Sequence, residues 1–77
     1  MNQHQLNILA AFDAAMQTFV DVWQAPDTTQ TQAAVAYGGA AALLILANNN
    51  TDAVVAIVQA KTLLNEAAKQ LGLPETN

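Results

Sequence analysis

Few side chains in this sequence are of the types that perform catalysis. The chain contains neither cysteine nor serine, so the two commonest nucleophilic side chains are absent. His4 is the single histidine, and no second histidine or cysteine stands at a spacing that would complete a metal site with it. We expect His4 to lie in a solvated, frayed N-terminal tail. Neither nucleophilic catalysis nor a histidine-based metal centre is predicted.

The carboxylates do not form an acid–base pair either. Asp13 and Asp21 are eight residues apart, which on one helix separates them by about 12 Å, farther than a paired-carboxylate mechanism uses. Asp27 and Asp52 are expected in the first turns of helices, where a carboxylate stabilises the positive pole of the helix dipole. The sequence therefore predicts a protein that is not an enzyme, with no catalytic residue, no cofactor and no metal.

The charge balance argues against nucleic acid as a partner. Six acidic residues stand against two lysines and no arginine, which gives a net charge of -4, whereas phosphate backbones are bound by basic surfaces. One of the two lysines, Lys61, is expected at the edge of a helix seam with its amine in water. The start, MNQHQLN, lacks the cationic and apolar segments of a secretory signal. This start is typical of a bacterial cytoplasmic protein or of one exported by another route.

Apolar spacing predicts three helices, at about residues 5–24, 29–47 and 52–71. The first carries apolar side chains at intervals of three and four, which is the seam of a helix packed in a bundle. These side chains are Leu9, Phe12, Met16, Phe19 and Trp23. Because the turns are short, successive helices should be antiparallel. The predicted fold class is all-α, an antiparallel three-helix bundle made of an N-terminal helix and a helical hairpin, in a single domain spanning 1–77.

Turn residues set the expected boundaries between the first two helices. Ala25-Pro26-Asp27 should stop the first helix, because proline disfavours helical geometry in the residue before it and has no amide hydrogen to donate. Either Asp27 with Gln30 or Thr29 with Gln32 should then form the capping box that starts the second. The two alternatives differ by two residues in where that helix begins.

The boundaries of the third helix are predicted from asparagine and glycine. The run 48–50, three asparagines, is expected to end the second helix with a residue in the left-handed conformation, and Thr51 and Asp52 should begin the third. Gly72 should adopt the left-handed conformation at its end, with Leu73 folding back on the last turn and Pro74 preventing continuation.

The second predicted helix has no polar side along much of its length. Its residues 43–46 are Leu, Leu, Ile and Leu, and four consecutive helical positions point in all directions. Val54, Val55 and Val58 fall on the polar side of the third helix, and the asparagine turn brings both groups to one end of the molecule. A contiguous apolar patch of this kind usually marks an interaction surface. We therefore predict a homodimer or higher homo-oligomer that completes the core, or a partner helix that covers the patch.

Two glycines in the middle of this helix support the same interpretation. Together, Gly38-Gly39 cost about 2 kcal/mol relative to two alanines. Ala34, Gly38 and Ala42 form a stripe without bulk, along which another backbone can approach closely. The alternative is a kink or break at Gly38-Gly39. The predicted self-association interface comprises nine residues: Ala34, Gly38, Ala42, Leu43, Leu44, Leu46, Val54, Val55 and Val58.

The apolar run from Ala33 to Ala47 also invites a membrane interpretation. A helix of these 15 residues reaches about 22 Å, whereas a bilayer has a hydrocarbon core of about 30 Å. Glutamine and asparagine flank the run, with no basic anchor. Membrane insertion is therefore not expected, and a holin-like or bacteriocin-like membrane-active factor is the weakest of the non-enzymatic alternatives.

The leading functional hypothesis is a small acidic helical protein that acts through self-association or protein–protein binding. A second class is a subunit of a structural polymer of phage-like or toxin-like type, favoured by abundant Ala, Gln, Asn and Thr and by scarce charge. The segment DAAMQTFVDVWQAP, from Asp13 to Pro26, resembles the helix-to-Ala-Pro segment of the R-body subunit family over about a fifth of the chain. The chain lacks that family's later glutamine-rich segment. This resemblance implies an assembly-forming subunit.

Overall fold

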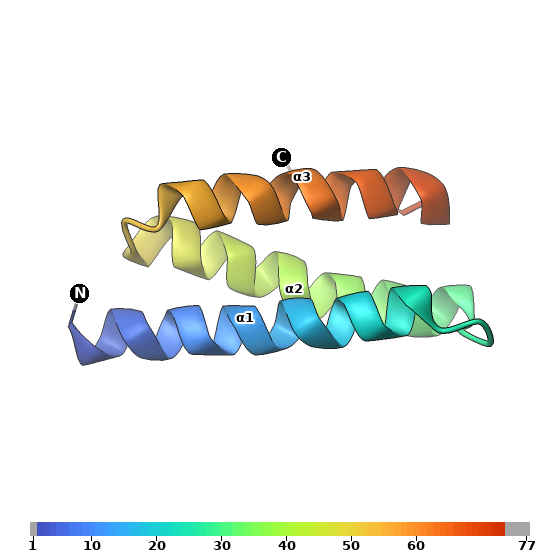
Figure 1. Ribbon diagram of the computed structural model, residues 1–77, viewed down its shortest axis with the longest axis horizontal. Helices are drawn as coiled ribbons and strands as arrows, with labels where there is room; N and C mark the ends of the chain where they lie inside the picture. The colour runs from blue at the N-terminus through green and yellow to red at the C-terminus, as the bar shows by residue number, and fades with distance from the viewer. Residues whose placement is uncertain (1, 74–77) are drawn as a thin grey trace.

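Three helices and two short connections make up the described chain (Figure 1). The structure is a computed structural model, and it describes residues 2–73. Helix α1 spans Gln3–Gln24, α2 spans Gln30–Asn50 and α3 spans Val54–Leu71. Residues 2–73 contain no strand, so the all-α prediction and the number of helices are confirmed.

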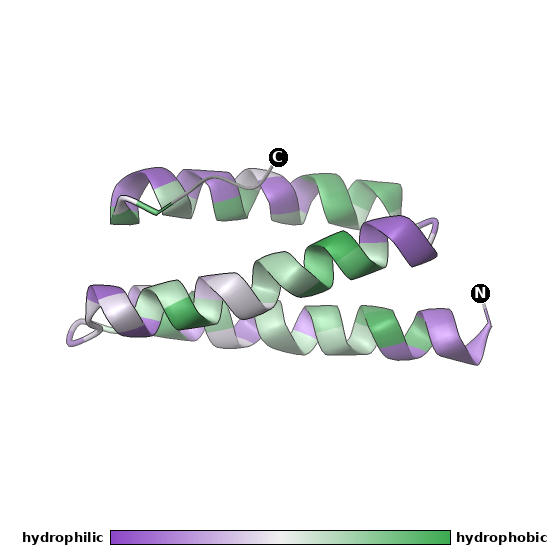
Figure 2. Ribbon diagram, turned by 180° about the vertical axis from the view of Figure 1, so that it is seen from behind, coloured by the Kyte–Doolittle hydropathy of each residue, from purple (hydrophilic) through white to green (hydrophobic). Residues whose placement is uncertain are grey.

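Helix α2 lies between the other two, and each neighbour runs antiparallel to it (Figures 1 and 2). It packs against both α1 and α3, and more extensively against α1. The molecule is flat, with extents of 39 × 20 × 15 Å between Cα atoms. Because α2 occupies the middle of a flat arrangement, its side away from α1 and α3 has no neighbour within the chain.

Helix α1 begins earlier than the sequence predicted. The Asn2 side chain accepts a hydrogen bond from the Gln5 amide at 2.9 Å, and the Gln5 side chain accepts one from the Asn2 amide at 3.1 Å. This capping box satisfies two amides that a helix start otherwise leaves unpaired. His4 therefore lies in the first turn of α1, exposed, and the prediction of a frayed tail there was wrong. The Gln5 side chain also donates to the Asn50 carbonyl at 3.0 Å, which joins α1 to the end of α2.

The second of the two proposed capping boxes starts α2. Thr29 accepts from the Gln32 amide at 3.1 Å, and the Gln32 side chain accepts from the Thr29 amide at 3.0 Å. The Thr28 hydroxyl donates to the Val22 carbonyl, which closes the turn from α1. Asp27 consequently lies in the turn and not in the first helical turn, so the role predicted for it at the helix pole was wrong.

The asparagine run does not end α2; it forms the last turn. The Asn50 side chain donates to the Leu46 carbonyl at 2.8 Å, and the Thr51 hydroxyl donates to the Ala47 carbonyl at 2.7 Å. These bonds satisfy carbonyls at the helix end without a left-handed residue, and no non-glycine residue described here has a positive φ. The predicted end near residue 47 was therefore three residues short.

Helix α3 begins later than predicted and ends as predicted. It starts at Val54, after Ala53, which makes no side-chain capping bond, so Asp52 lies outside the first turn. At the other end Gly72 has φ 71°, and the Leu73 amide donates to the Ala68 carbonyl at 2.9 Å. This is the Schellman arrangement expected of Gly72 and Leu73. Pro74 lies outside the described residues.

Aromatic and aliphatic side chains from all three helices form the core. Phe19 is fully buried, stacks on Trp23 with ring centroids 5.9 Å apart and meets the Tyr37 ring edge-on at 5.9 Å. The seam predicted for the first helix is confirmed in Phe12 and Phe19, which are buried, while Leu9, Met16 and Trp23 are half-buried against the core. Six alanines complete the buried set: Ala33, Ala40, Ala47, Ala60, Ala67 and Ala68.

Helix α2 is continuous through Gly38-Gly39, so the predicted alternative of a break there was wrong. A Cβ atom added at either glycine would meet nothing within 4 Å, so no contact within the chain requires glycine at these positions.

The Gly38→Ala variant is expected to stabilise the protomer by about 1 kcal/mol, because alanine loses less conformational entropy in a helix and has room here. The thermal midpoint, followed by circular dichroism at high dilution, should rise by about 4–8 °C. Gly72→Ala is the matched control, and it should lower the midpoint because φ there is 71°. A Gly38→Ala midpoint at or below that of the parent protein would contradict the interpretation of Gly38 as a residue without an internal packing role.

Candidate self-association surface

Apolar side chains remain exposed at the end of the molecule where α1 begins, α2 ends and α3 begins. We call this group the apolar end; its members are Leu6, Ile45, Leu46, Val54, Val55 and Val58. Val55 is 71% exposed and Ile45 is 53% exposed. Figure 2 shows strongly hydrophobic ribbon on α2 and α3 at this end. The expectation that water meets apolar side chains here is confirmed for the single chain.

A second apolar feature runs along α2 on its side away from the other helices. This outer face consists of Val35, Gly38, Gly39, Ala42, Ile45 and Leu46, all of them exposed. Val35 is the most exposed of the large apolar residues, at 73%. Helix α2 carries no charged residue from Gln30 to Asn50, so the outer face is apolar or small along its whole central part. Ile45 and Leu46 belong to both features, which are therefore continuous.

The nine predicted interface residues differ in their exposure to solvent. Six of them are exposed: Gly38, Ala42, Leu46, Val54, Val55 and Val58. Ala34 and Leu43 are half-buried, and Leu44 is only 3% exposed because its side chain lies in the core shared by the three helices. An interface on this chain would thus receive no direct contact from Leu44.

Sequence reasoning missed Val35, Ile45 and Leu6 as parts of this surface. Val35 stands three and four residues before the two glycines, so the helical period that selected Gly38 also places Val35 beside it. Ile45 lies seven residues after Gly38, about two helical turns along the same side. Leu6 lies outside the seam of α1, and its spacing from Leu9 and Phe12 gave no signal of exposure.

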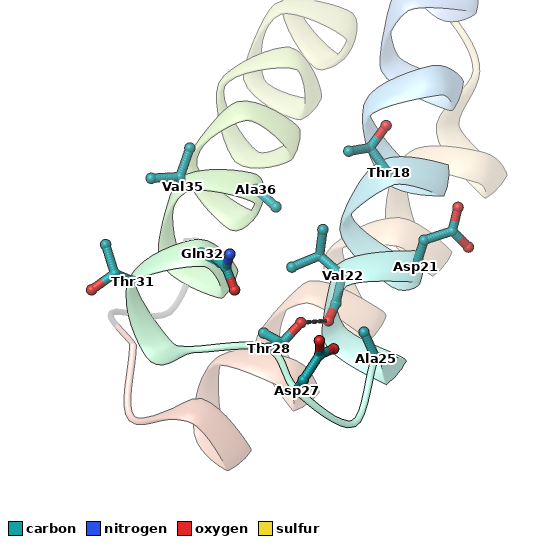
Figure 3. Close-up of a pocket in the computed structure, with 10 residues that line it drawn as sticks. All are labelled: Thr18, Asp21, Val22, Ala25, Asp27, Thr28, Thr31, Gln32, Val35 and Ala36. Atoms are coloured by element: carbon teal, nitrogen blue, oxygen red, sulfur yellow. Dashed lines mark hydrogen bonds between the residues drawn. The ribbon is translucent and has the colours of Figure 1, made fainter.

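An open groove of about 670 Å³ adjoins the outer face where α2 begins. Figure 3 shows side chains of α1, the turn and α2 around it. Its apolar side chains are Val22 and Ala25 from the α1 side and Val35 and Ala36 from α2. Its polar side chains are Thr18, Asp21, Asp27, Thr28, Thr31 and Gln32. This set holds no nucleophile of raised reactivity and no cation, so the groove offers a shape for apolar groups and no reactive centre.

A third apolar region is the groove between α1 and α3. Leu9, Phe12 and Met16 line it from α1, and Ala56 and Leu63 line it from α3, with no residue from α2. It therefore opens on the other side of the molecule from the outer face of α2. Two of the three half-buried seam side chains, Leu9 and Met16, line this groove.

The titratable side chains do not converge on a reactive site. Within residues 2–73, no three His, Asp or Glu side chains lie close enough to hold a metal ion. The same part of the chain has no buried side-chain polar atom without a hydrogen-bond partner. Asp21 and Asp27 line the groove at the start of α2, and Asp13 lines the α1–α3 groove. Lys61 is half-buried beside Ile45, Asn48 and Val58, in the cleft between α2 and α3.

The architecture and surface define an all-α protein of three helices with an exposed apolar face. Comparison with known proteins finds no matching family model, no similar curated protein and no similar solved structure. By length and composition, α2 is one helix of the described chain that is long and apolar enough to cross a membrane. Core helices of water-soluble proteins meet the same criterion, so this property alone assigns no location.

Proposed function

We propose that this chain is a non-enzymatic protein that works by self-association through the outer face of α2 and the apolar end. One observation carries the proposal: Ile45, Leu46 and Val58 are each more than 40% exposed on adjacent helices, although all three are large apolar side chains. A contiguous apolar surface of this kind marks interaction sites on soluble proteins. Within residues 2–73, the titratable side chains do not form a cluster that could serve as a catalytic site.

The energetics favour coverage of this surface. Burying a whole valine or leucine side chain contributes about 1.5–3 kcal/mol, and Val54, Val55 and Val58 are each more than half exposed. A chain of this length buries only about 60% of the surface of its unfolded form, and alanine supplies nearly half of its core positions. A second copy would add the apolar contacts that the single chain lacks.

The proposal predicts a particle of twice the chain mass of 8.1 kDa. Size-exclusion chromatography with light scattering over micromolar concentrations measures this mass directly. The dimer should persist through dilution to low micromolar protein and should strengthen in sulfate salts, which favour apolar burial. A single species of 8.1 kDa throughout that range would remove the basis of the proposal.

The alternative function, a subunit of a structural polymer, rests on the α1–α3 groove. An apolar groove on one side and an apolar face on the other allow each copy to bind the next head to tail, and such heterologous contacts extend into filaments when the rotation does not close. Negative-stain electron microscopy at high protein concentration separates the two functions. Ribbons or filaments support the polymer, and small discrete particles support the closed dimer.

A further inference from the structure

The outer face of α2 has a symmetry that selects one way for two copies to meet. We infer that α2 packs antiparallel against α2 of a second copy, about a two-fold axis that passes between Ala40 and Ala41. This inference rests on the proposed self-association and adds to it the partner, the direction and the register.

The first observation is the order of residues along the face. Val35 lies as far before the midpoint of residues 40 and 41 as Leu46 lies after it, and Gly39 and Ala42 are related in the same way. In an antiparallel pair with its axis at that midpoint, Leu46 of one copy lies opposite Val35 of the other. Gly39 then faces Ala42 of the other copy where the helices cross, and these small residues allow the backbones to approach closely.

The second observation is independent of this pairing and gives the same register. On the side of α2 nearer to α3, Ile45 is a large exposed side chain, whereas Ala34 and Gly38 are small. The two-fold axis between Ala40 and Ala41 brings Ile45 of one copy to a position midway between Ala34 and Gly38 of the other. A bulky side chain entering a gap between small residues of the facing helix is the usual way in which helices interlock.

The groove at the start of α2 provides a third match, on the side nearer to α1. Val35 lines this groove together with Ala36 and, from α1, Val22 (Figure 3). A two-fold axis perpendicular to the helices places the α1 side of one copy next to the α1 side of the other. Leu46 of the second copy, which lies opposite Val35, is therefore over the groove that Val35 lines. An exposed leucine thus meets an open concavity whose apolar part includes Val22, Val35 and Ala36.

Area and charge fit a second copy as the occupant. The broad side of the molecule that presents α2 in Figure 2 measures 39 × 20 Å between Cα atoms. A side of this size is large enough to supply the area of about 800 Å² that a standard interface takes from each partner. Each copy carries a net charge of -4, but α2 contains no charged residue, so no like charges are apposed along the helix pair itself. The nearest carboxylates on the α1 side, Asp21 and Asp27, are exposed to water in the groove.

Disulfide cross-linking tests the register, because the natural chain has no cysteine. Val35→Cys and Leu46→Cys are made as separate single variants, at two exposed positions, and circular dichroism verifies that each remains helical. A disulfide requires Cα atoms within about 7 Å, and in the antiparallel pair two copies of residue 35 are separated by about 16 Å along the helices. The two variants, one of them carrying an affinity tag, are mixed and oxidised, and mass spectrometry identifies the linked pairs.

The expected result is a disulfide between residue 35 of one copy and residue 46 of the other, formed about tenfold faster or more than either homodisulfide, because only this pair meets the distance requirement. Gln59→Cys, in the α1–α3 groove, serves as the control for random collision, and it should cross-link slowly with all partners. Preferred 35–35 and 46–46 disulfides would show a parallel pair and overturn the inference. Equal rates for all pairs would also overturn it.

Failure of this inference is distinguishable from failure of the proposed function. A protein that has twice the chain mass in light scattering, without preferred 35–46 cross-linking, retains the self-association and loses only the antiparallel register. A protein that has the mass of one chain loses both.

Discussion

The Phe19→Ala variant is expected to lose about 3–5 kcal/mol of stability, since removal of a buried aromatic ring sacrifices its transfer free energy and leaves a cavity. The Phe19 ring is fully buried between Trp23 of its own helix and Tyr37 of α2, so both neighbours lose a contact. Small domains have total stabilities of about 5–15 kcal/mol. Urea unfolding followed by circular dichroism should therefore show a midpoint shifted to very low urea, or no cooperative transition at all.

The neighbouring variant Thr18→Ala is the control for this measurement. Thr18 is exposed on the same helix, so its replacement removes no buried group and should change the stability by less than about 0.5 kcal/mol. Both variants are compared at one protein concentration, because association contributes to apparent stability. A loss below about 1 kcal/mol in Phe19→Ala would mean that the contact between α1 and α2 is not centred on this ring.

The Leu46→Lys variant should remain helical and lose its self-association. Leu46 is 42% exposed, so a lysine there can extend its amine into water in the single chain. In the dimer each copy would lose the apolar contacts of Leu46 and would have to desolvate that charge, at a cost of several kcal/mol per ion. Asp21 and Asp27 of the facing groove offset little of this cost, because ion pairs with exposed carboxylates contribute at most about 1 kcal/mol. The dissociation constant should rise by at least about a hundredfold. Light scattering measures the mass, and circular dichroism shows whether the helices persist.

Three further lysine variants make this result specific. Val55→Lys, at the apolar end, should weaken association while it preserves the helices, because Val55 is 71% exposed. Gln59→Lys adds the same charge on the other side of the molecule and should leave the dimer intact. Leu44→Lys should destabilise the protomer itself, since Leu44 is 3% exposed, and this effect precedes any effect on association. A Leu46→Lys protein that still dimerises with the affinity of the parent would exclude Leu46 from the interface.

The sequence predicted the helices well because their signals are local. The three-and-four spacing around Phe12 and Phe19 identified the buried side of α1, and one of the two capping pairs that the sequence offered, Thr29–Gln32, starts α2. Gly72 has no competing role, so its left-handed conformation followed from residue type alone. These features depend on residues within one turn of each other, where a sequence contains all the needed information.

The errors arose where a side chain had more than one possible partner. Asn50 can end a helix in the left-handed conformation or bond back to the preceding turn, and it does the latter, donating to Leu46. The first helix was expected to begin at about residue 5, but the Asn2–Gln5 capping box starts it at Gln3, and the Gln5 side chain also reaches the carbonyl of Asn50 in another helix. The sequence showed that residues 43–46 encircle α2, but not that α1 and α3 would cover Leu44 and leave Ile45 and Leu46 exposed. That choice depends on where the neighbouring helices lie in space.

The order of the helices in space, with α2 in the middle, has a consequence for how the chain reaches its native state. Every extensive contact joins helices that are consecutive along the chain, through connections of only a few residues. Proteins in which neighbours in sequence are also neighbours in space fold rapidly, since little loop entropy is lost before contacts form. The ring contacts among Phe19, Trp23 and Tyr37 all lie within the hairpin of α1 and α2, so they can form before α3 is in place. During synthesis this hairpin can assemble while the last third of the chain is still within the ribosome.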